Sequence, residues 1–529
     1  MAVWCTPKTY GPFNGRSQHL GGPWPVYLVL IPTLFACVQP TTHDHVALEG
    51  KPESLEQAAP TWVEDFALAV SDESVADGVV DGLQPTRRPH VVLISLDTLR
   101  ADHLGAWGYD RPTSPFLDAL TRSGVRFQRV YSQSPKTAPS HMSLFTGTYP
   151  SAHGAHFAYK TNPPTVYPVA KGLELLPETM RRAGYRTAAW TGGGQVSSTA
   201  GFDRGFDQYS EDLGDIDSWK MNEVRAWFRR NSDEPCFLFI HTYQIHDPYL
   251  PPSPYNLIFA SDYKGWVIGD KDRLRTIAGG TEYEDLYHAF WRTPDLNPDP
   301  ASVGPDDLQQ LVALYDGGIR YTDDVLNGFF EDLRQDGLLD NTLVVVFSDH
   351  GEEFLEHDGL LHEKLYRETL HVPLIFFWPA GLPGDVVIES QVPLIDLGPT
   401  LLDLAAVETP GHMEGRSLLP LLQDPVEVNH RFVFSEEPWV HDGHHRSIRD
   451  GSNTLYDHGA GEIELFSVVE DPLEHEDLST THPELAVEMR RRLLDFITAH
   501  GLLQRDSQEE ARELSSDEIE ALRALGYIE

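Results

Sequence analysis

The stretch "HVVLISLD", residues 90–97, decides the fold class of this chain. A continuous run of aliphatic and β-branched residues is typical of a strand buried on both faces, as in parallel sheets. The segment that follows, "TLRADHLGAWGY" at residues 98–109, is predicted to be helical. A strand followed by a helix indicates an α/β unit, in which the strand presents the Asp97 carboxylate at its carboxyl end.

The same alternation continues along the chain. Further strands are predicted at "RTAAWTGG" (186–193), "CFLFIHTY" (236–243), "NTLVVVFSDHGEE" (341–353) and "HVPLIFFWP" (371–379), and helices at "LLPETMRRAGY" (175–185) and residues 306–337. Strands that alternate with helices predict an α/β fold, a large and mostly parallel sheet flanked by helices, over residues 89–429.

The C-terminal region, residues 430–529, has a different pattern. Its segments "RFVFSEE" (431–437), "HRSIRDGSNTLYDHG" (445–459) and "EIELFSVVEDPLE" (462–474) resemble short strands joined by turns. The segment "PELAVEMRRRLLDFITAHG" (483–501) has the spacing of an amphipathic helix. We therefore predict a small antiparallel α+β subdomain here.

Residues 1–37 have the features of an export signal. The apolar run "VYLVLIPTLFAC", residues 26–37, is too short to span a bilayer comfortably and has the length of a signal-peptide core. The residues before Cys37 resemble a bacterial lipoprotein cleavage site, with an ordinary signal peptide or a short anchor as the alternative. Residues 38–88 are polar and acidic, which is typical of a tether. We predict an exported, periplasmic or cell-surface protein that meets the membrane through a lipid anchor only.

Charge and cysteine content limit the partners and the means of stabilisation. The net charge is −41, from 81 acidic and 40 basic residues, and this negative field opposes binding to nucleic acid. A small anionic substrate stays compatible with it, because local groups at a site outweigh the global charge. The three cysteines, Cys5, Cys37 and Cys236, cannot build a disulfide framework. The sequence leaves the oligomeric state open.

Two predicted strands end in residues that can bind a metal. One ends in Asp97, and another ends in the adjacent pair Asp349 and His350. A single aspartate at a strand end is commonly a helix cap, but two such ends favour a shared site. Two carboxylates and an imidazole suit one Zn²⁺ or Mn²⁺ ion better than Ca²⁺, and Ca²⁺ and Mg²⁺ are the alternatives.

The stretch "SPKTAPSHMSLFTG", residues 134–147, places Thr137 directly before a helical run. Capping of that helix requires only Ser140. The chemical interpretation makes Thr137 a nucleophile, because a divalent metal and a helix N-terminus both favour loss of the hydroxyl proton.

From about residue 90 to its end, the chain resembles the sulfatases of the alkaline phosphatase superfamily. The segments that carry the resemblance are "VVLISLDTLRADHLGAWGYDRPTSPFLDAL", "PSHMSLFTGTYPSAHG", "HTYQIHDPYLPP", "FSDHGEEFLEHDGLLHEKLYRETLHVPLIF" and "LRALGYIE". The resemblance implies an enzyme that cleaves a small anionic ester. It also implies that Asp97, Asp349 and His350 bind one divalent metal ion, and that Thr137 is both a ligand of this ion and the nucleophile.

The chain departs from the family pattern at four places. Thr137 stands where sulfatases carry the cysteine or serine that becomes formylglycine, whereas related phosphodiesterases and phosphoglycol transferases resemble it in using threonine. His141 replaces an arginine, Thr98 replaces a second aspartate, and no lysine–histidine pair precedes "GFD" at residues 201–203. These departures favour phosphoester chemistry over sulfate hydrolysis by formylglycine.

The resemblance also assigns roles around the nucleophile. His246 would protonate the leaving group, while Lys364 and His141 would hold the non-bridging oxygens. His241, His357 and His362 are weaker candidates for the site. A second metal near His357 and His362 is an alternative, but Gln244 stands where many relatives carry an acid, so we expect one metal.

These features together predict a metal-dependent hydrolase of sulfate or phosphate esters that passes through a covalent Thr137 intermediate. The first alternative is a sulfuric ester hydrolase, similar to arylsulfatases, that works without formylglycine. The second is a non-catalytic binding protein that keeps the fold.

Overall fold

The computed structural model describes residues 88–158, 164–260, 262–278, 283–292, 299–425, 431–437, 445–500, 512–515 and 519. The predicted signal peptide with Cys37, and the tether as far as residue 87, lie outside the described residues, so export and the lipid anchor stay predictions. In the described part, no helix combines the length and the hydropathy needed to cross a membrane.

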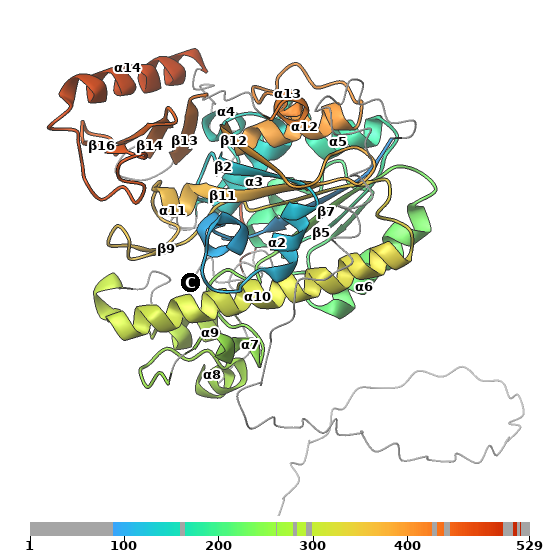
Figure 1. Ribbon diagram of the computed structural model, residues 1–529, viewed down its shortest axis with the longest axis horizontal. Coiled ribbons are helices and arrows are strands. Elements are labelled where there is room, and N and C mark those ends of the chain that lie inside the picture. The colour runs from blue at the N-terminus through green and yellow to red at the C-terminus, as the bar shows by residue number, and fades with distance from the viewer. Residues whose placement is uncertain are drawn as a thin grey trace, which may run out of the picture. The chain divides into compact units, whose positions relative to one another are not determined.

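An eight-stranded sheet forms the centre of the structure, in the order β12-β2-β11-β8-β1-β7-β5-β6 (Figure 1). The strands are β1 (His90–Leu96), β2 (Val125–Tyr131), β5 (Arg186–Trp190), β6 (Gln208–Ser210), β7 (Cys236–Thr242), β8 (Thr342–Phe347), β11 (His371–Phe377) and β12 (Val386–Pro393). Strand β11 is antiparallel to β8 and β2, and the other pairings are parallel. The predicted large, mostly parallel sheet is confirmed.

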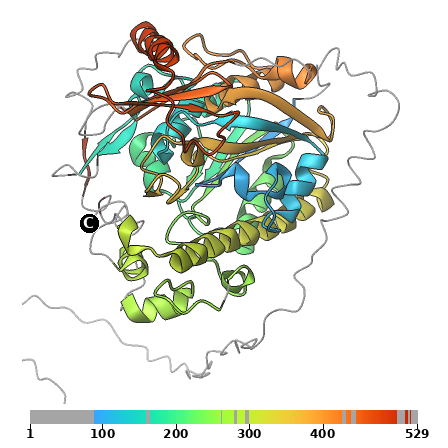
Figure 2. The same ribbon diagram turned by 60° about the vertical axis from the view of Figure 1, so that its left-hand side comes forward.

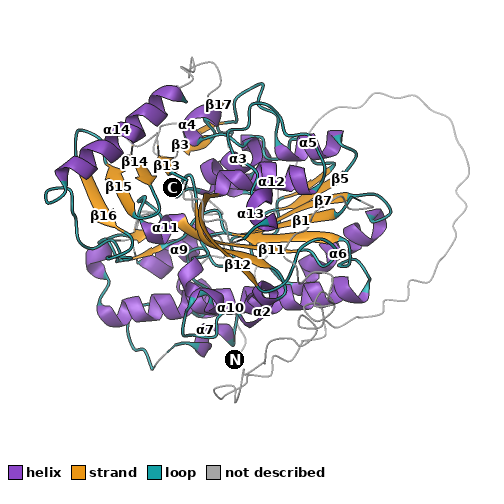
Figure 3. Cartoon of the chain, turned by 45° about the horizontal axis from the view of Figure 1, so that its top comes forward, coloured by secondary structure: helices purple, strands orange, loops and turns teal. Residues whose placement is uncertain are grey.

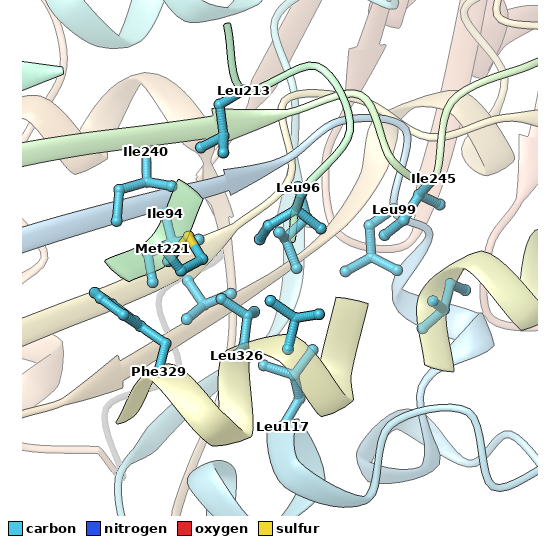
Figure 4. Packing of buried hydrophobic residues seen from close by; sticks show 14 of the residues in the cluster. Ile94, Leu96, Leu99, Leu117, Leu213, Met221, Ile240, Ile245, Leu326 and Phe329 are labelled. Carbon is cyan, nitrogen blue, oxygen red and sulfur yellow. The ribbon is translucent and has the colours of Figure 1, made fainter. Parts of the chain in front are cut away.

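Helices cover both faces of this sheet (Figures 2 and 3). The α-helices of the described part are α2 (Pro115–Arg122), α3 (Thr137–Thr146), α4 (Pro150–His153), α5 (Leu176–Arg182), α6 (Ser218–Asn231), α7 (Tyr255–Ile258), α8 (Lys271–Ala278), α9 (Tyr283–Trp291), α10 (Pro305–Gln335), α11 (Arg367–Leu370), α12 (Leu397–Leu404), α13 (Leu419–Gln423) and α14 (Pro483–Ala499), of which α14 packs on the C-terminal sheet. Strand β1 is buried on both sides, as its apolar run predicted: Val92 and Ile94 pack with α2, α6 and α10 (Figure 4), and Val91 and Leu93 pack with α3, α5 and α12.

The segment 98–109, predicted to be a helix, forms only two short 3-10 turns, Ala101–His103 and Gly105–Trp107. The prediction of a regular helix was wrong here. Thr98 has a left-handed φ of 59°, which turns the chain sharply at the end of β1. The Tyr315 hydroxyl donates a hydrogen bond to the Thr98 carbonyl at 2.7 Å, so contacts with α10 hold this segment in place of helical hydrogen bonds.

The C-terminal part contains a four-stranded antiparallel sheet covered by α14. Its strands are β13 (Val433–Glu437), β14 (His445–Arg449), β15 (Asn453–Asp457) and β16 (Ile463–Ser467). The antiparallel α+β part of the predicted fold is confirmed, while its boundary at residue 430 stays a prediction. Two small antiparallel sheets complete the described strands: β9 (Glu353–Phe354) with β10 (Leu360–Leu361), and β3 (His156–Ala158) with β4 (Thr165–Tyr167) and β17 (Arg512–Glu513).

Glu474 connects the C-terminal sheet to the main sheet. It is completely buried, and it accepts hydrogen bonds from Arg449 at 2.8 Å and from the Tyr456 hydroxyl at 2.6 Å. It also accepts a hydrogen bond from the backbone N–H of Arg367, at the start of α11. Since Arg449 is itself buried, Glu474 provides the counter-charge that makes its burial tolerable.

Replacement of Glu474 with alanine is expected to lower the free energy of unfolding by about 3–5 kcal/mol, because it leaves a buried guanidinium unpaired. Urea denaturation followed by fluorescence measures this change. The exposed neighbour Glu470→Ala is the matched control, expected within about 0.5 kcal/mol of wild type. Equal stability of the two variants would contradict the assignment.

Candidate metal centre and active site

Two neighbouring strands and one helix bring the predicted ligands together. Strands β1 and β8 are parallel neighbours, with Ser95 paired to Phe347, so their carboxyl ends lie at the same edge of the sheet. Asp97 follows β1 directly, while Asp349 and His350 follow β8. All three side chains are completely buried. A cluster of ligands at the carboxyl edge of a parallel sheet is the expected place for a site in this fold class.

The three side chains form a compact group. Asp97, Asp349 and His350 each offer a ligand atom, and these atoms lie within 4.8 Å of one another. Within the described residues, Asp97 Oδ1 and both carboxylate oxygens of Asp349 accept no hydrogen bond. Buried carboxylate oxygens without donors are costly, and a cation between them would offset that cost. The residues present therefore fit a divalent cation with oxygen and nitrogen ligands.

Thr137 lies against this group. It is the first residue of α3, it is completely buried, and its Oγ1 lies 3.2 Å from His350 Nε2. His350 Nδ1 donates to the Gly351 carbonyl at 3.0 Å, so the lone pair of the neutral ring is on Nε2, which faces Thr137 and the two aspartates. This arrangement is typical of a metal-binding histidine whose second nitrogen is held by a backbone carbonyl.

The protonation of the group depends on burial and on mutual repulsion. Burial raises the pKa of Asp349 well above its usual range, and the negative charge of Asp97 adds to the rise. Burial also opposes ionisation of Asp97, but the hydrogen bond from His241 and the neighbouring imidazoles, which become charged at acidic pH, together outweigh it and lower the pKa of Asp97. Burial lowers the pKa of His350 to about 4, so the ring is neutral at physiological pH. A bound cation would favour the ionised form of both acids.

Two buried serines fix the backbone on which the ligands sit. Ser348 Oγ accepts a hydrogen bond from the Leu99 N–H at 3.0 Å and donates to the His350 carbonyl at 2.7 Å. Ser140 Oγ donates to the Asp349 carbonyl at 2.7 Å. These bonds tie the ends of β1 and β8 to each other and to the first turn of α3, which restricts the positions of the ligands.

His241, a weaker candidate in the sequence, supports Asp97 from β7. Its Nε2 donates to Asp97 Oδ2 at 3.0 Å, and its Nδ1 accepts a long hydrogen bond of 3.5 Å from the Gly192 N–H. The bond occupies one oxygen of Asp97 and leaves Oδ1 facing His350. His241 therefore orients a ligand.

His141 lies below the first turn of α3, with both ring nitrogens bonded to protein atoms. Nδ1 donates to the Thr137 carbonyl at 2.9 Å, and Nε2 accepts a hydrogen bond from Ser95 at 2.8 Å. Burial lowers the pKa of His141 to about 3, so the ring carries no charge. Because both ring nitrogens already have partners in the protein, His141 has none left to hold a non-bridging oxygen as predicted. Its contacts position Thr137 instead.

Two further histidines border the cluster. The His362 ring lies 4.6 Å from the His350 ring and 5.1 Å from the His246 ring, measured between centroids. His246 Nδ1 donates to the Asp247 carbonyl at 2.7 Å and lies 3.1 Å from Asp247 Oδ1. The structure thus brings His246 to the site, together with His362, which the sequence ranked lower.

Lys364 and His357 have their contacts outside the cluster. Lys364 Nζ donates to the His357 carbonyl and lies 3.4 Å from Glu353 Oε1. His357 donates to Glu368 at 2.6 Å and to the Glu474 carbonyl at 2.8 Å, which is a structural role. Another lysine, Lys136, was not considered, although it directly precedes Thr137 in the sequence.

Comparison with known proteins supports the same framework. The sulfatase family model matches residues 89–407, and the model described as N-sulphoglucosamine sulphohydrolase, C-terminal, matches residues 356–499. The chain is 25% identical to an arylsulfatase of Clostridium perfringens over 441 residues, covering 73% of this chain and 89% of that protein. It is 23% identical to arylsulfatase K of Canis lupus familiaris over 457 residues, covering 77% and 82%.

Solved structures share the fold. A phosphonate monoester hydrolase of Agrobacterium radiobacter aligns with a TM-score of 0.61 and 21% identity, covering 78% of this chain and 96% of that one. A structure in complex with its substrate D-glucosamine-2-N,6-O-disulfate aligns with a TM-score of 0.61 and 18% identity, covering 80% and 100%.

Removal of divalent metal with a chelator is expected to lower the melting temperature of the wild-type protein, because a cation at a hundred times its Kd stabilises by about 2.7 kcal/mol. In Asp349→Asn, one of the two facing carboxylates is gone, so the metal-free protein is expected to melt higher than metal-free wild type and to lose the metal-dependent shift. Differential scanning calorimetry with metal analysis measures both effects. Asp358→Asn, an exposed acid of the same segment, is the control. A chelator-insensitive wild type would refute the site.

Proposed function

The chain belongs to the sulfatase family, whose model covers residues 89–407, and from this premise we propose that it cleaves sulfate or phosphate esters with Thr137 as nucleophile. The observation that carries this proposal is the position of Thr137 Oγ1, 3.2 Å from His350 Nε2 at the N-terminus of α3. Asp97, Asp349 and His350 would hold the metal there. The chemistry of these ligands favours Zn²⁺ or Mn²⁺.

When bound, a divalent cation supplies Lewis-acid chemistry, which lowers the pKa of a neighbouring hydroxyl and offsets the charge of the ester. The positive end of the α3 dipole favours the same charge distribution at Thr137. The contacts of His141 and Ser140 hold the first turn of α3, so the nucleophile is oriented before substrate binds.

Thr137 reacts in its ionised form, after its hydroxyl proton has passed to solvent. Its Oγ1 forms a bond to sulfur or phosphorus, and the bond from that atom to the alcohol oxygen breaks. His246, with Asp247 beside its Nδ1, donates a proton from Nε2 to the departing oxygen. Water then attacks the covalent threonine ester, the bond from Thr137 Oγ1 to sulfur or phosphorus breaks, and His246 takes up the proton that water releases, which restores ionised Thr137. This sequence has two half-reactions, so it gives ping-pong kinetics.

Replacement of Thr137 with alanine is expected to reduce kcat by about a thousandfold or more, because no other hydroxyl takes its place. Thr137→Ser keeps the hydroxyl and is the matched control, expected to retain measurable turnover and to trap the same covalent adduct. Steady-state kinetics and intact-protein mass spectrometry after a substrate quench measure these outcomes. Full activity in a folded Thr137→Ala protein would refute the nucleophile.

A panel of aryl sulfates, phosphate monoesters, phosphodiesters and phosphonate monoesters tests the ester class. Because threonine is not expected to become formylglycine, we expect phosphorus esters to exceed aryl sulfates by about tenfold in kcat/KM. A tenfold or larger preference for sulfate would support instead an arylsulfatase-like enzyme without formylglycine, the second candidate, which the named relatives favour. No turnover and no bound metal would identify a binding protein.

A further inference from the structure

Gln195 is a buried glutamine at the N-terminus of α3. It lies in the 3-10 turn Gly194–Val196, which follows β5, and it is only 6% exposed. Its Oε1 accepts a hydrogen bond from the Ala138 N–H at 3.3 Å. That N–H belongs to the peptide unit that joins Thr137 to Ala138, so the Gln195 amide lies directly against the residue that carries the proposed nucleophile.

The loop that carries Gln195 also contacts the support of a proposed metal ligand. The Gly192 N–H donates a long hydrogen bond of 3.5 Å to His241 Nδ1, and His241 holds Asp97. A Cβ on Gly192 would lie 2.3 Å from a ring carbon of Tyr243, so only glycine allows the loop to approach this closely. These contacts place the loop against both the nucleophile helix and the metal ligands, which locates Gln195 where the ester would react.

The hydrogen bonds of this region leave two donors for a ligand. In the first turn of α3, Pro139 has no N–H, and the Ser140 N–H donates to a backbone carbonyl at 3.0 Å. The Ala138 N–H donates to Gln195. Among the residues that the structure describes, neither the Thr137 N–H nor Gln195 Nε2 has an acceptor. Buried donors are almost always paired, so two unpaired donors beside a reactive hydroxyl indicate a ligand with acceptor oxygens.

The hydrogen bond from Ala138 also fixes the orientation of the Gln195 amide. A backbone N–H requires an acceptor, so Oε1 faces Ala138 and the donor Nε2 is the other terminal atom. The two terminal atoms of an amide lie about 2.3 Å apart, so Nε2 is within about 6 Å of the Ala138 nitrogen. A tetrahedral ester that faces Thr137 Oγ1 has its outer oxygens in this range. Because the carbonyl end of the amide accepts a hydrogen bond, its N–H end becomes a stronger donor.

We propose, on the basis of the function proposed above, that Gln195 Nε2 and the Thr137 N–H donate hydrogen bonds to the non-bridging oxygens of the ester. Gln195 is then a substrate-binding residue that the sequence did not predict. Both donors are neutral and are held in place at the first turn of α3, so they stabilise the negative charge that develops on these oxygens without a rearrangement of the protein. They also supply the contact that His141 has no nitrogen left to make.

Binding of inorganic sulfate to the metal-loaded protein, measured by isothermal titration calorimetry, tests this inference. Gln195→Met keeps the length of the side chain and removes the donor, so it is expected to raise the Kd about tenfold or more. The matched control is Gln133, which is also buried: its Oε1 accepts a hydrogen bond from the Ile395 N–H at 2.6 Å, but its Nε2 donates to the Tyr131 carbonyl. Gln133→Met should therefore lower the melting temperature and leave the Kd unchanged.

Amide NMR of protein with isotope-labelled glutamine separates ligand contact from capping of α3. The Gln195 side-chain signal, assigned by its absence in Gln195→Glu, is expected to shift when sulfate is added, while the Gln133 signal stays in place. No shift of the Gln195 signal, no sulfate binding by the wild type, or an unchanged Kd in Gln195→Met would overturn the inference. Neither measurement needs turnover, and both can be repeated in Thr137→Ala, which keeps the N–H of that residue. Failure of the proposed nucleophile is thereby distinguished from failure of the Gln195 contact.

Discussion

The structure depends on two buried carboxylates that face each other at the edge of a parallel sheet. At about 4 Å and an effective dielectric constant near 20, two ionised carboxylates would repel by about 4 kcal/mol. Burial and the charge of Asp97 therefore raise the pKa of Asp349 well above its usual range. Three of the four oxygens of Asp97 and Asp349 have no hydrogen-bond donor among the described residues, so the protein itself does little to relieve this repulsion. A divalent cation would relieve it, and the neutral Nε2 of His350 would complete a ligand set suited to that cation.

The other residues of the site are arranged around these two carboxylates. Because β1 and β8 are parallel neighbours, their carboxyl ends place Asp97 beside Asp349 without any contribution from long loops. Ser348 and Ser140 then tie both strand ends to the first turn of α3, which places Thr137 at the same point. Thr137 is thus positioned by hydrogen bonds between buried side chains and the backbone, and not by the exposed loops around the site.

The sequence predicts the site residues that follow strands well, and those that lie on loops poorly. Continuous apolar runs end in Asp97 and Asp349, and the sheet topology does the rest, so their meeting could be anticipated. The two strands at one end of the sheet were missed: β12, at the edge, and its neighbour β2 have no long apolar run, because they alternate or carry polar residues. The turns at 98–109 have a helical composition, but tertiary hydrogen bonds from α10 override it. Lys364 was expected at the site from the family resemblance. Its position depends on the conformation of the loop between β10 and α11, which cannot be read from sequence spacing, and its Nζ bonds the His357 carbonyl instead.

The neutral His141 leaves its position in α3 without a fixed positive charge. A cation in the second turn of α3 would hold the substrate anion directly, but His141 is buried, uncharged and bonded to Ser95 and to the Thr137 carbonyl. These hydrogen bonds stabilise the first turn of α3, but a neutral histidine supplies no fixed positive charge. Lys136 directly precedes Thr137, but its ammonium group is paired with Glu363, so its charge is already partly neutralised within the protein.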